Sequence, residues 1–177
     1  MNFRIIFTFF VLGVALVGCS LDGDSNQTPQ VALADYPRLQ SGDSLNVMTT
    51  DEYNVFSLDT VQVGDTVSFV LYMLSYSNDL TGFYLTQSAD SSAVIILPET
   101  TSMDSVFLSH SDYAKGQFFM QTGFNSMYFP FKYVAKKVNK ETTIGFRVVS
   151  DAVFENTLTG SNSSSFELIT PIKDSIQ

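Results

Sequence analysis

The sixteen residues "VQVGDTVSFVLYMLSY", Val61 to Tyr76, decide the fold of this chain. Every second residue from Val67 to Met73 is apolar, and strand side chains repeat every two residues, so these share one face of a strand. The positions between them, from Val70 to Leu74, are apolar as well. A strand with two apolar faces belongs in the middle of a sheet with both sides covered. The preceding Gly64-Asp65 is a turn signal, so a buried central strand is predicted to begin at about residue 66.

Similar runs of β-branched and aromatic residues recur along the chain, separated by Gly, Ser, Asn and Asp. In "TTIGFRVVS" (142–150) the alternation points Ile144, Phe146 and Val148 inward and Arg147 outward. No window sustains the 3.6-residue periodicity of a helix. The predicted strands lie within 52–63, 66–76, 83–87, 93–98, 103–109, 116–121, 126–138, 142–150 and 163–170.

This pattern predicts an all-β fold of seven to nine short strands. The turn "VQVGDTVSF" resembles the entry to the second strand of bacterial immunoglobulin-like domains, and the pair 142–150 and 163–170 resembles their final hairpin. The resemblance implies an antiparallel, immunoglobulin-like sandwich, which we expect to form one domain over residues 46–173. A closed β-barrel is the alternative architecture.

The first 18 residues have the parts of a secretory signal. "MNFR" carries one positive charge at Arg4, and Ile5–Val17 is an uncharged run of 13 residues. That run is too short to cross a bilayer as a helix, which needs roughly 20 apolar residues. It leads to Cys19, the only cysteine of the chain, so no intrachain disulfide can form.

The residues Leu16-Val17-Gly18-Cys19 resemble the lipobox that ends the signal of bacterial lipoproteins. The resemblance implies cleavage after Gly18, a diacylglyceryl thioether on Cys19, and acylation of the new amino terminus. Several acyl chains anchor a protein stably, whereas one gives only marginal binding. We therefore expect residues 1–18 to be a signal peptide and the membrane to be a partner through the lipid on Cys19.

The residues after Cys19 bear on localisation. Ser20 resembles an outer-membrane sorting residue, and Asp22 and Asp24 loosely resemble the acidic tract of Bacteroidota lipoproteins. Residues 19–45 are polar and carry prolines, so they are predicted to be a flexible tether, although Val31–Leu39 is a candidate edge strand. The expected localisation is the outer membrane, on its periplasmic or cell-surface face.

The charge balance argues against nucleic acid as a partner. The chain has 9 basic and 18 acidic residues, and loss of Arg4 with the signal leaves a formal charge of −10. Nucleic-acid binding requires a basic footprint, which this composition does not supply.

The few histidine and cysteine residues limit the catalytic and metal-binding chemistry that this chain could perform. His110 is the only histidine, so neither a copper site nor a zinc enzyme can be assembled on the usual ligands. "SHSD" (109–112) contains nucleophile, base and acid types, but adjacent residues rarely point at one another, and triads come from separate segments. The acidic residues occur mostly in turns, where Asp caps the backbone. We expect no enzyme activity, no cofactor and no metal site.

Two further patterns suggest surface roles. Phe124, Met127 and Tyr128 lie beside a Gly-Phe-Asn turn and are a candidate exposed binding patch. Asp followed by Ser or Thr and an aliphatic residue occurs five times, and this resembles the O-glycosylation signal of exported Bacteroidota proteins. The alternative is structural, since a turn Asp before a β-branched residue is how strands begin. The candidate glycosylation sites are Ser44, Thr60, Thr66, Ser105 and Ser175.

Together these observations predict a lipid-anchored, non-catalytic module that binds a glycan or a surface protein, or forms a structural part of a surface assembly. Two alternatives remain open. One is an envelope hydrolase or enzyme inhibitor that acts through a loop, and the other is a small-ligand carrier with an internal cavity.

Overall fold

Residues Thr66–Leu74 form strand β6, which has strands hydrogen-bonded along both of its edges, as predicted for a central strand. Val67, Phe69, Leu71 and Met73 of β6 are all buried. The structure is a computed structural model, and it describes residues 26–88, 91–154 and 160–175 of the 177-residue chain. Among these residues no helix is long and apolar enough to span a membrane.

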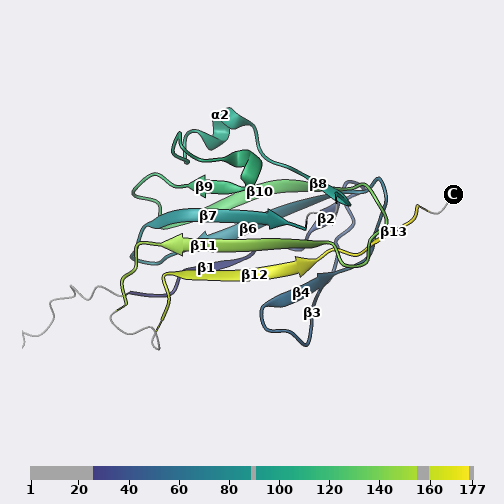
Figure 1. Cartoon of the computed structure of the whole chain (residues 1–177), viewed down its shortest axis with the longest axis horizontal. Helices are drawn as coiled ribbons and strands as arrows, with labels where there is room; N and C mark the ends of the chain where they lie inside the picture. Colours follow the sequence, from purple (N-terminus) through teal and green to yellow (C-terminus); the bar gives the residue numbers. More distant parts are fainter. Residues whose placement is uncertain (1–25, 89–90, 155–159, 176–177) are drawn as a thin grey trace, which may run out of the picture.

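Two sheets, which we call sheet A and sheet B, stack on each other and give the sandwich that the sequence predicts (Figure 1). Sheet A runs in the order β1 (Gln30–Leu33), β6, β10 (Ser126–Ala135) and β8 (Ala93–Ile96), with β2 (Arg38–Leu39) also paired to β6. Sheet B runs in the order β3 (Val47–Thr49), β4 (Val55–Leu58), β12 (Ser163–Ile169), β11 (Thr143–Ser150), β7 (Leu80–Gln87) and β9 (Gln117–Phe119). A third, two-stranded sheet pairs β5 (Val61–Gln62) with β13 (Ile172–Lys173).

The strand order is that of an immunoglobulin-type sandwich, in which A-B-E-D faces G-F-C. Sheet A places β1, β6, β10 and β8 in the first order, and sheet B places β12, β11 and β7 in the second. Both sheets keep open edges, so the closed barrel considered as the alternative is not formed by the described residues. Eight of the strands have four or more residues, and the others have two or three.

Three details differ from the sequence expectation. Two ladders, β4 with β12 and β5 with β13, are parallel, which is possible because each joins strands that are distant in the chain and need no tight turn. Residues 103–109 do not form a strand. They continue from the short helix α2 (Thr100–Met103) into turns, because the amides of residues 102–104 donate to the carbonyls of Glu99 and Thr100. Strand-type pairing in this segment is limited to an isolated bridge between Phe107 and Met120.

The sandwich also begins earlier than predicted. Residues 30–45 belong to the sandwich and not to the predicted tether: β1 and β2, which lie largely within the candidate edge strand Val31–Leu39, pair antiparallel with β6. Pro37 is tolerated because it lies between the two strands and not within either of them. Leu45 is buried in the core, which fixes the end of this segment to the domain.

Aromatic side chains fill the space between the sheets. Phe69 and Phe131 stack at 4.9 Å between ring centroids, and Phe131 contacts Phe146 of the opposite sheet at 5.8 Å. Tyr133 is fully buried, and its hydroxyl is satisfied by a 2.9 Å hydrogen bond with the hydroxyl of Thr170. A core that is rich in Phe and free of Trp therefore supplies the volume that joins the two sheets.

Candidate functional site

The two long side edges of the sandwich are finished differently. On one side β8 and β9 are bridged by residues 97–116, which carry α2 and the 3₁₀ turn η1 (Tyr113–Lys115). Figure 1 shows this segment along the upper margin of the sheets, and the β3–β4 hairpin along the lower margin. On the hairpin side the two sheets leave a groove of about 760 Å³ between them.

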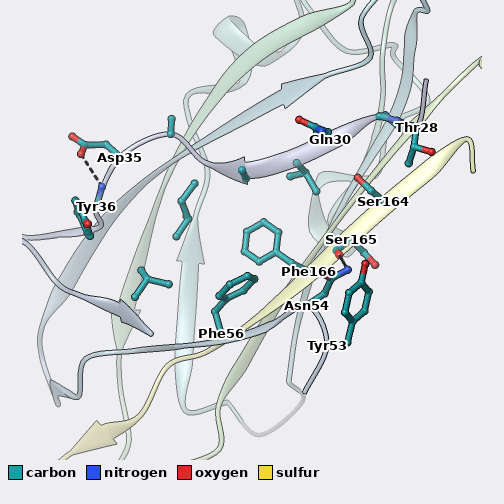
Figure 2. A pocket seen from close by; sticks show the side chains of 16 residues that line it. Thr28, Gln30, Asp35, Tyr36, Tyr53, Asn54, Phe56, Ser164, Ser165 and Phe166 are labelled. Carbon is teal, nitrogen blue, oxygen red and sulfur yellow. Dashed lines mark hydrogen bonds between the residues drawn. The ribbon is translucent and has the colours of Figure 1, made fainter. Parts of the chain in front are cut away.

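We call this the edge groove, and Figure 2 shows it from close by. One wall is continuous: the nine residues from Thr28 to Tyr36, which include β1. The other wall comes from the β3–β4 hairpin and from β12. Its lining residues on that side are Val47, Tyr53, Asn54, Phe56, Ser164, Ser165 and Phe166.

The floor of the edge groove is aromatic. Phe56 meets Phe166 edge to face, with ring centroids 5.9 Å apart, and Phe166 contacts Phe146 of the core at 4.7 Å. In Figure 2 the rings of Phe56 and Phe166 lie together between the two walls. Val31 and Leu33 of β1 pack against the core from the other side and stay half-buried. The floor thus continues the core outward to solvent.

The wall made by β1 has backbone groups that no strand of the described chain uses. β1 pairs with β6 alone. The Ala34 amide donates to the Val70 carbonyl at 2.8 Å, which marks the even-numbered residues of this strand as the hydrogen-bonded set. In an antiparallel ladder the alternate residues point their amide and carbonyl groups the other way. Val31 and Leu33 therefore present an N–H and a C=O each toward the open edge.

The rim of the groove carries exposed tyrosines and small polar groups. The Tyr53 side chain is 91% exposed, and Tyr36 is 61% exposed. Asn54 has a left-handed backbone with φ +58°, a conformation that Asn adopts more readily than most residues, and its Nδ2 donates to the Ser165 carbonyl at 3.2 Å. The Ser164 hydroxyl is buried and has no partner among the described residues. Polar recognition groups thus surround an apolar floor, as in many binding sites.

One end of the rim is held by Asp35. Its carboxylate accepts from the Tyr36 amide at 2.8 Å and from Arg38 at 3.3 Å. These bonds, the amide bond first, hold the pKa of Asp35 below its usual value. The charge is therefore already paired within the turn, and the rest of the lining has no acidic or basic side chain.

Two other hollows occur on the described surface. One, of about 780 Å³, lies between β8 and the η1 turn, on the side bridged by residues 97–116. The other, of about 560 Å³, lies on the outer face of sheet B and shares Tyr53, Asn54, Ser165 and Phe166 with the edge groove. Of the three, the edge groove has both an aromatic floor and an unpaired strand beside it.

The lipobox residues Leu16, Val17, Gly18 and Cys19 lie outside the described residues, so lipidation stays a prediction. The candidate patch of Phe124, Met127 and Tyr128 is not a single exposed surface. Tyr128 is 64% exposed, on the outer face of β10, where it stacks on Tyr72. Phe124 and Met127 instead pack against the core. Met127 and Tyr128 are adjacent in one strand, so they point to opposite faces.

The five Asp-Ser/Thr positions lie in or near turns. Ser44, Thr60, Ser105 and Ser175 are exposed, and Thr66 is half-buried. Two of the preceding acids cap the backbone: Asp59 accepts from the Asn46 amide at 2.7 Å, and Asp65 accepts from the Gln62 amide at 2.7 Å. These contacts favour the structural explanation at those two positions, and glycosylation stays a prediction.

The "SHSD" segment does not assemble a triad. His110 is exposed and stacks on Phe119 at 4.9 Å, with no hydrogen bond to its neighbours among the described residues. Ser111 accepts from the Phe119 amide, and Asp112 pairs with Lys115 at 2.8 Å. Within the described part of the chain no three His, Cys, Asp or Glu side chains are grouped to hold a metal ion.

The sequence pattern does not predict the edge groove. "EYNVF" (52–56) has the pattern of a strand, although a Tyr-Asn pair before a strand is a turn signal that places an aromatic at a loop tip. The partner residues Phe56 and Phe166 are 110 positions apart in the chain. Only the parallel pairing of β4 with β12 brings them together.

Comparisons with known proteins identify no family. No family model matches the chain, and no curated protein matches it. Among solved structures it is similar to a family 123 glycoside hydrolase from Clostridium perfringens, described in terms of glycolipid glycan hydrolysis. That similarity has a TM-score of 0.44 and 11% sequence identity, over 85% of this chain and 28% of the other. We draw nothing about fold or function from a similarity at this level.

Proposed function

We propose that the protein is a lipid-anchored, non-catalytic module of the outer membrane that binds an extended polypeptide segment of a surface partner in the edge groove. The observation that carries the proposal is the juxtaposition of the unpaired edge of β1 with the apolar floor at Phe56 and Phe166. Addition of a strand to an open edge uses both features: main-chain hydrogen bonds supply affinity, and pockets for alternate side chains supply specificity.

The dimensions of the groove support an extended occupant. Its continuous wall, Thr28 to Tyr36, is nine residues long, which is about 30 Å at roughly 3.3 Å per residue. Side chains at every second position of an added strand would point into the gap between the sheets. There they would meet Val31 and Leu33 on one side and Phe56 on the other. The exposed Tyr36 and Tyr53 would close over the two walls.

The charge of the groove favours an uncharged segment. Asp35 is the one ionisable acid or base among its lining residues, and Arg38 already pairs with it. A strongly acidic or basic peptide would find no opposite charge to replace its lost hydration. We therefore expect partners rich in apolar and hydroxyl side chains.

Amide NMR on the full-length protein tests this function. The probe is a synthetic nine-residue peptide with alternating Val and Thr, and the control is a peptide of the same composition with the Val residues clustered. We expect the alternating peptide to shift the amide signals of Val31 and Leu33 and to slow their hydrogen exchange. Unchanged signals at about millimolar peptide would contradict the proposal.

Matched variants locate the binding. Phe56→Ala removes the floor and should weaken the peptide at least about tenfold, because a large aromatic contact is lost. Tyr128→Ala removes an exposed tyrosine from the outer face of sheet A and should leave binding unchanged. Equal losses in both variants would place the peptide elsewhere.

The anchor is tested separately. Cys19→Ser removes the thiol that the lipobox chemistry requires, so the variant should carry no acyl chains and keep its signal peptide. Intact mass of the wild-type protein should show loss of residues 1–18 and gain of acyl chains. A wild-type mass equal to the unmodified polypeptide would overturn the anchor but not the groove.

A further inference from the structure

The outer face of sheet B holds a second hollow, which the proposed function does not use. It lies over β4, β12, β11 and β7, has a volume of about 560 Å³, and faces away from the core. Tyr53 borders it at the tip of the β3–β4 hairpin, and Tyr84 lines it on β7. We call it the sheet B hollow.

One glycine lines the hollow, and a second lies beside the Tyr84 ring. Gly145 on β11 faces outward at its floor, and a Cβ added there would lie 2.5 Å from the Thr86 hydroxyl. Nearby on β7, a Cβ on Gly82 would lie 3.4 Å from Cε2 of Tyr84 and 3.6 Å from its hydroxyl. The Tyr84 ring therefore leans over the bare backbone of Gly82 and lies along the sheet. The guanidinium of Arg147 lies over this ring, so the two side chains together form one flat surface.

Polar side chains of both signs line the hollow. Arg147 lies over the Tyr84 ring at 6.0 Å from its centroid, and its Nη2 donates to the Ser163 hydroxyl at 3.4 Å. No described carboxylate forms an ion pair with it. Glu52 and Glu167 also line the hollow, and their carboxylates accept no hydrogen bond from the described residues. One guanidinium and two carboxylates thus share a small surface without neutralising one another.

This combination matches a saccharide in its chemistry. A sugar ring has an apolar face of C–H groups, which packs on an aromatic ring, and an edge of hydroxyls that both donate and accept hydrogen bonds. Arg donates only and ionised Glu accepts only, so a site with both satisfies hydroxyls in each role. Such charge-assisted bonds are stronger than neutral ones. Mixed charge also disfavours a polyanion or a polycation, since either would meet a like charge.

We propose that the sheet B hollow is a binding site for a neutral saccharide, with the Tyr84–Arg147 pair as the packing surface, Arg147 also as donor, and Glu52 and Glu167 as acceptors. Tyr53, at the boundary shared with the edge groove, packs on the opposite side of the sugar. Tyr53 borders both sites, but Tyr84 and Arg147 line only the sheet B hollow, and β1 and Phe56 line only the edge groove, so either proposal can fail without the other.

The test uses full-length protein in a detergent without a sugar headgroup, with cellohexaose, xylohexaose, mannohexaose and chitohexaose as probes. Saturation-transfer NMR and calorimetric titration should show binding of at least one hexasaccharide. No binding of any of the four at about 10 mM would overturn the proposal.

Variants then place the sugar. Arg147→Met keeps the aliphatic stem but removes the donor, and Glu167→Gln removes the charge, so each should weaken binding at least about tenfold. Lys132→Met, on the exposed outer face of sheet A, is the matched control and should have no effect. Both residues mutated in the hollow are exposed, and unchanged melting temperatures would confirm that the fold is intact.

Phe56→Ala separates this site from the edge groove. It should weaken the peptide and leave the hexasaccharide unaffected, whereas Arg147→Met should do the reverse. Sugar binding that survives Arg147→Met but is lost in Phe56→Ala would overturn the assignment to the sheet B hollow.

Discussion

The two side edges of the sandwich contain similar aromatic residues but end differently. On the β8–β9 side, Phe107, Phe118 and Phe129 form a cluster in which each ring is at most 3% exposed. On the β1–β4 side, Phe56 is only half-buried and borders a groove. The difference lies in the segment that covers each edge. Residues 97–116 bring Met103 and Phe107 into the core. Residues 34–54 instead form a turn and a hairpin beside the edge groove and leave it open. Covered phenylalanines stabilise the fold, and uncovered ones are available to a partner.

The largest expected effect is on the covered side. Phe118→Ala should destabilise the protein by about 3–5 kcal/mol, because Phe118 is fully buried and contacts Phe83, Phe107, Tyr113 and Phe129. Urea unfolding monitored by tyrosine fluorescence measures the change. A loss below about 1 kcal/mol would show that this cluster is as open as the groove and would remove the contrast.

The second effect concerns how the cover is attached. Gly116 has φ +65°, and a Cβ there would overlap the carbonyl oxygen of Leu85. Gly116→Ala should therefore push η1 and β9 away from β7 and cost about 1–3 kcal/mol for backbone strain alone. Thermal unfolding gives the size of the loss. Gly123→Ala, at a positive φ but with open space around it, is the control and should cost less.

A smaller effect is expected on the open side. Phe56→Ala should reduce the free energy of unfolding by only about 1–2 kcal/mol, because its side chain is already partly in solvent. The same variant should nevertheless lose peptide binding. Denaturant unfolding of this variant beside Phe118→Ala is the direct comparison of the two edges, and equal destabilisation would contradict it.

The smallest effect is a pH dependence at the turns that flank the two edges. The pKa of Asp112 is lowered by its hydrogen bond with Lys115, and that of Asp35 by the Tyr36 amide and then Arg38. A lowered pKa means that each carboxylate stabilises the folded state above its usual value of 3.8, and that this contribution is lost as the pH falls through the folded value. Both groups are exposed, so the effect on global stability should be slight.

Hydrogen exchange between about pH 5 and pH 3 resolves the two turns. Exchange at Lys115 and Gln117 should show added opening in acid, and Asp112→Asn should abolish that pH dependence without altering exchange at Tyr36. Asp35→Asn should have the converse effect. If either variant changed both turns, the two edges would not be independent.

Much of the fold could be predicted from local pattern. The alternation in 66–76 and 142–150 placed Phe69, Ile144 and Phe146 in the core and Arg147 on the surface, as observed. The local pattern of Val31–Leu39 indicates only a candidate edge strand, and the predicted tether is therefore too long. The pairing of β1 and β2 depends on the edge that β6 offers, which local pattern does not reveal. The same limit applies to Phe124 and Met127, which are partly buried against the core.

The sequence by itself determined the class of this protein. The period-2 alternation of apolar residues imposes strands, since each side chain must face either core or solvent, and the single cysteine after an apolar run predicts the lipid anchor. Only the tertiary structure decided where binding surfaces lie. The edge groove joins Phe56 to Phe166, and the sheet B hollow joins Tyr53 to Tyr84 and Arg147, across chain separations of 31 residues or more. Such a surface combines residues from strands that become neighbours only when the sheets form, so local sequence pattern does not reveal it.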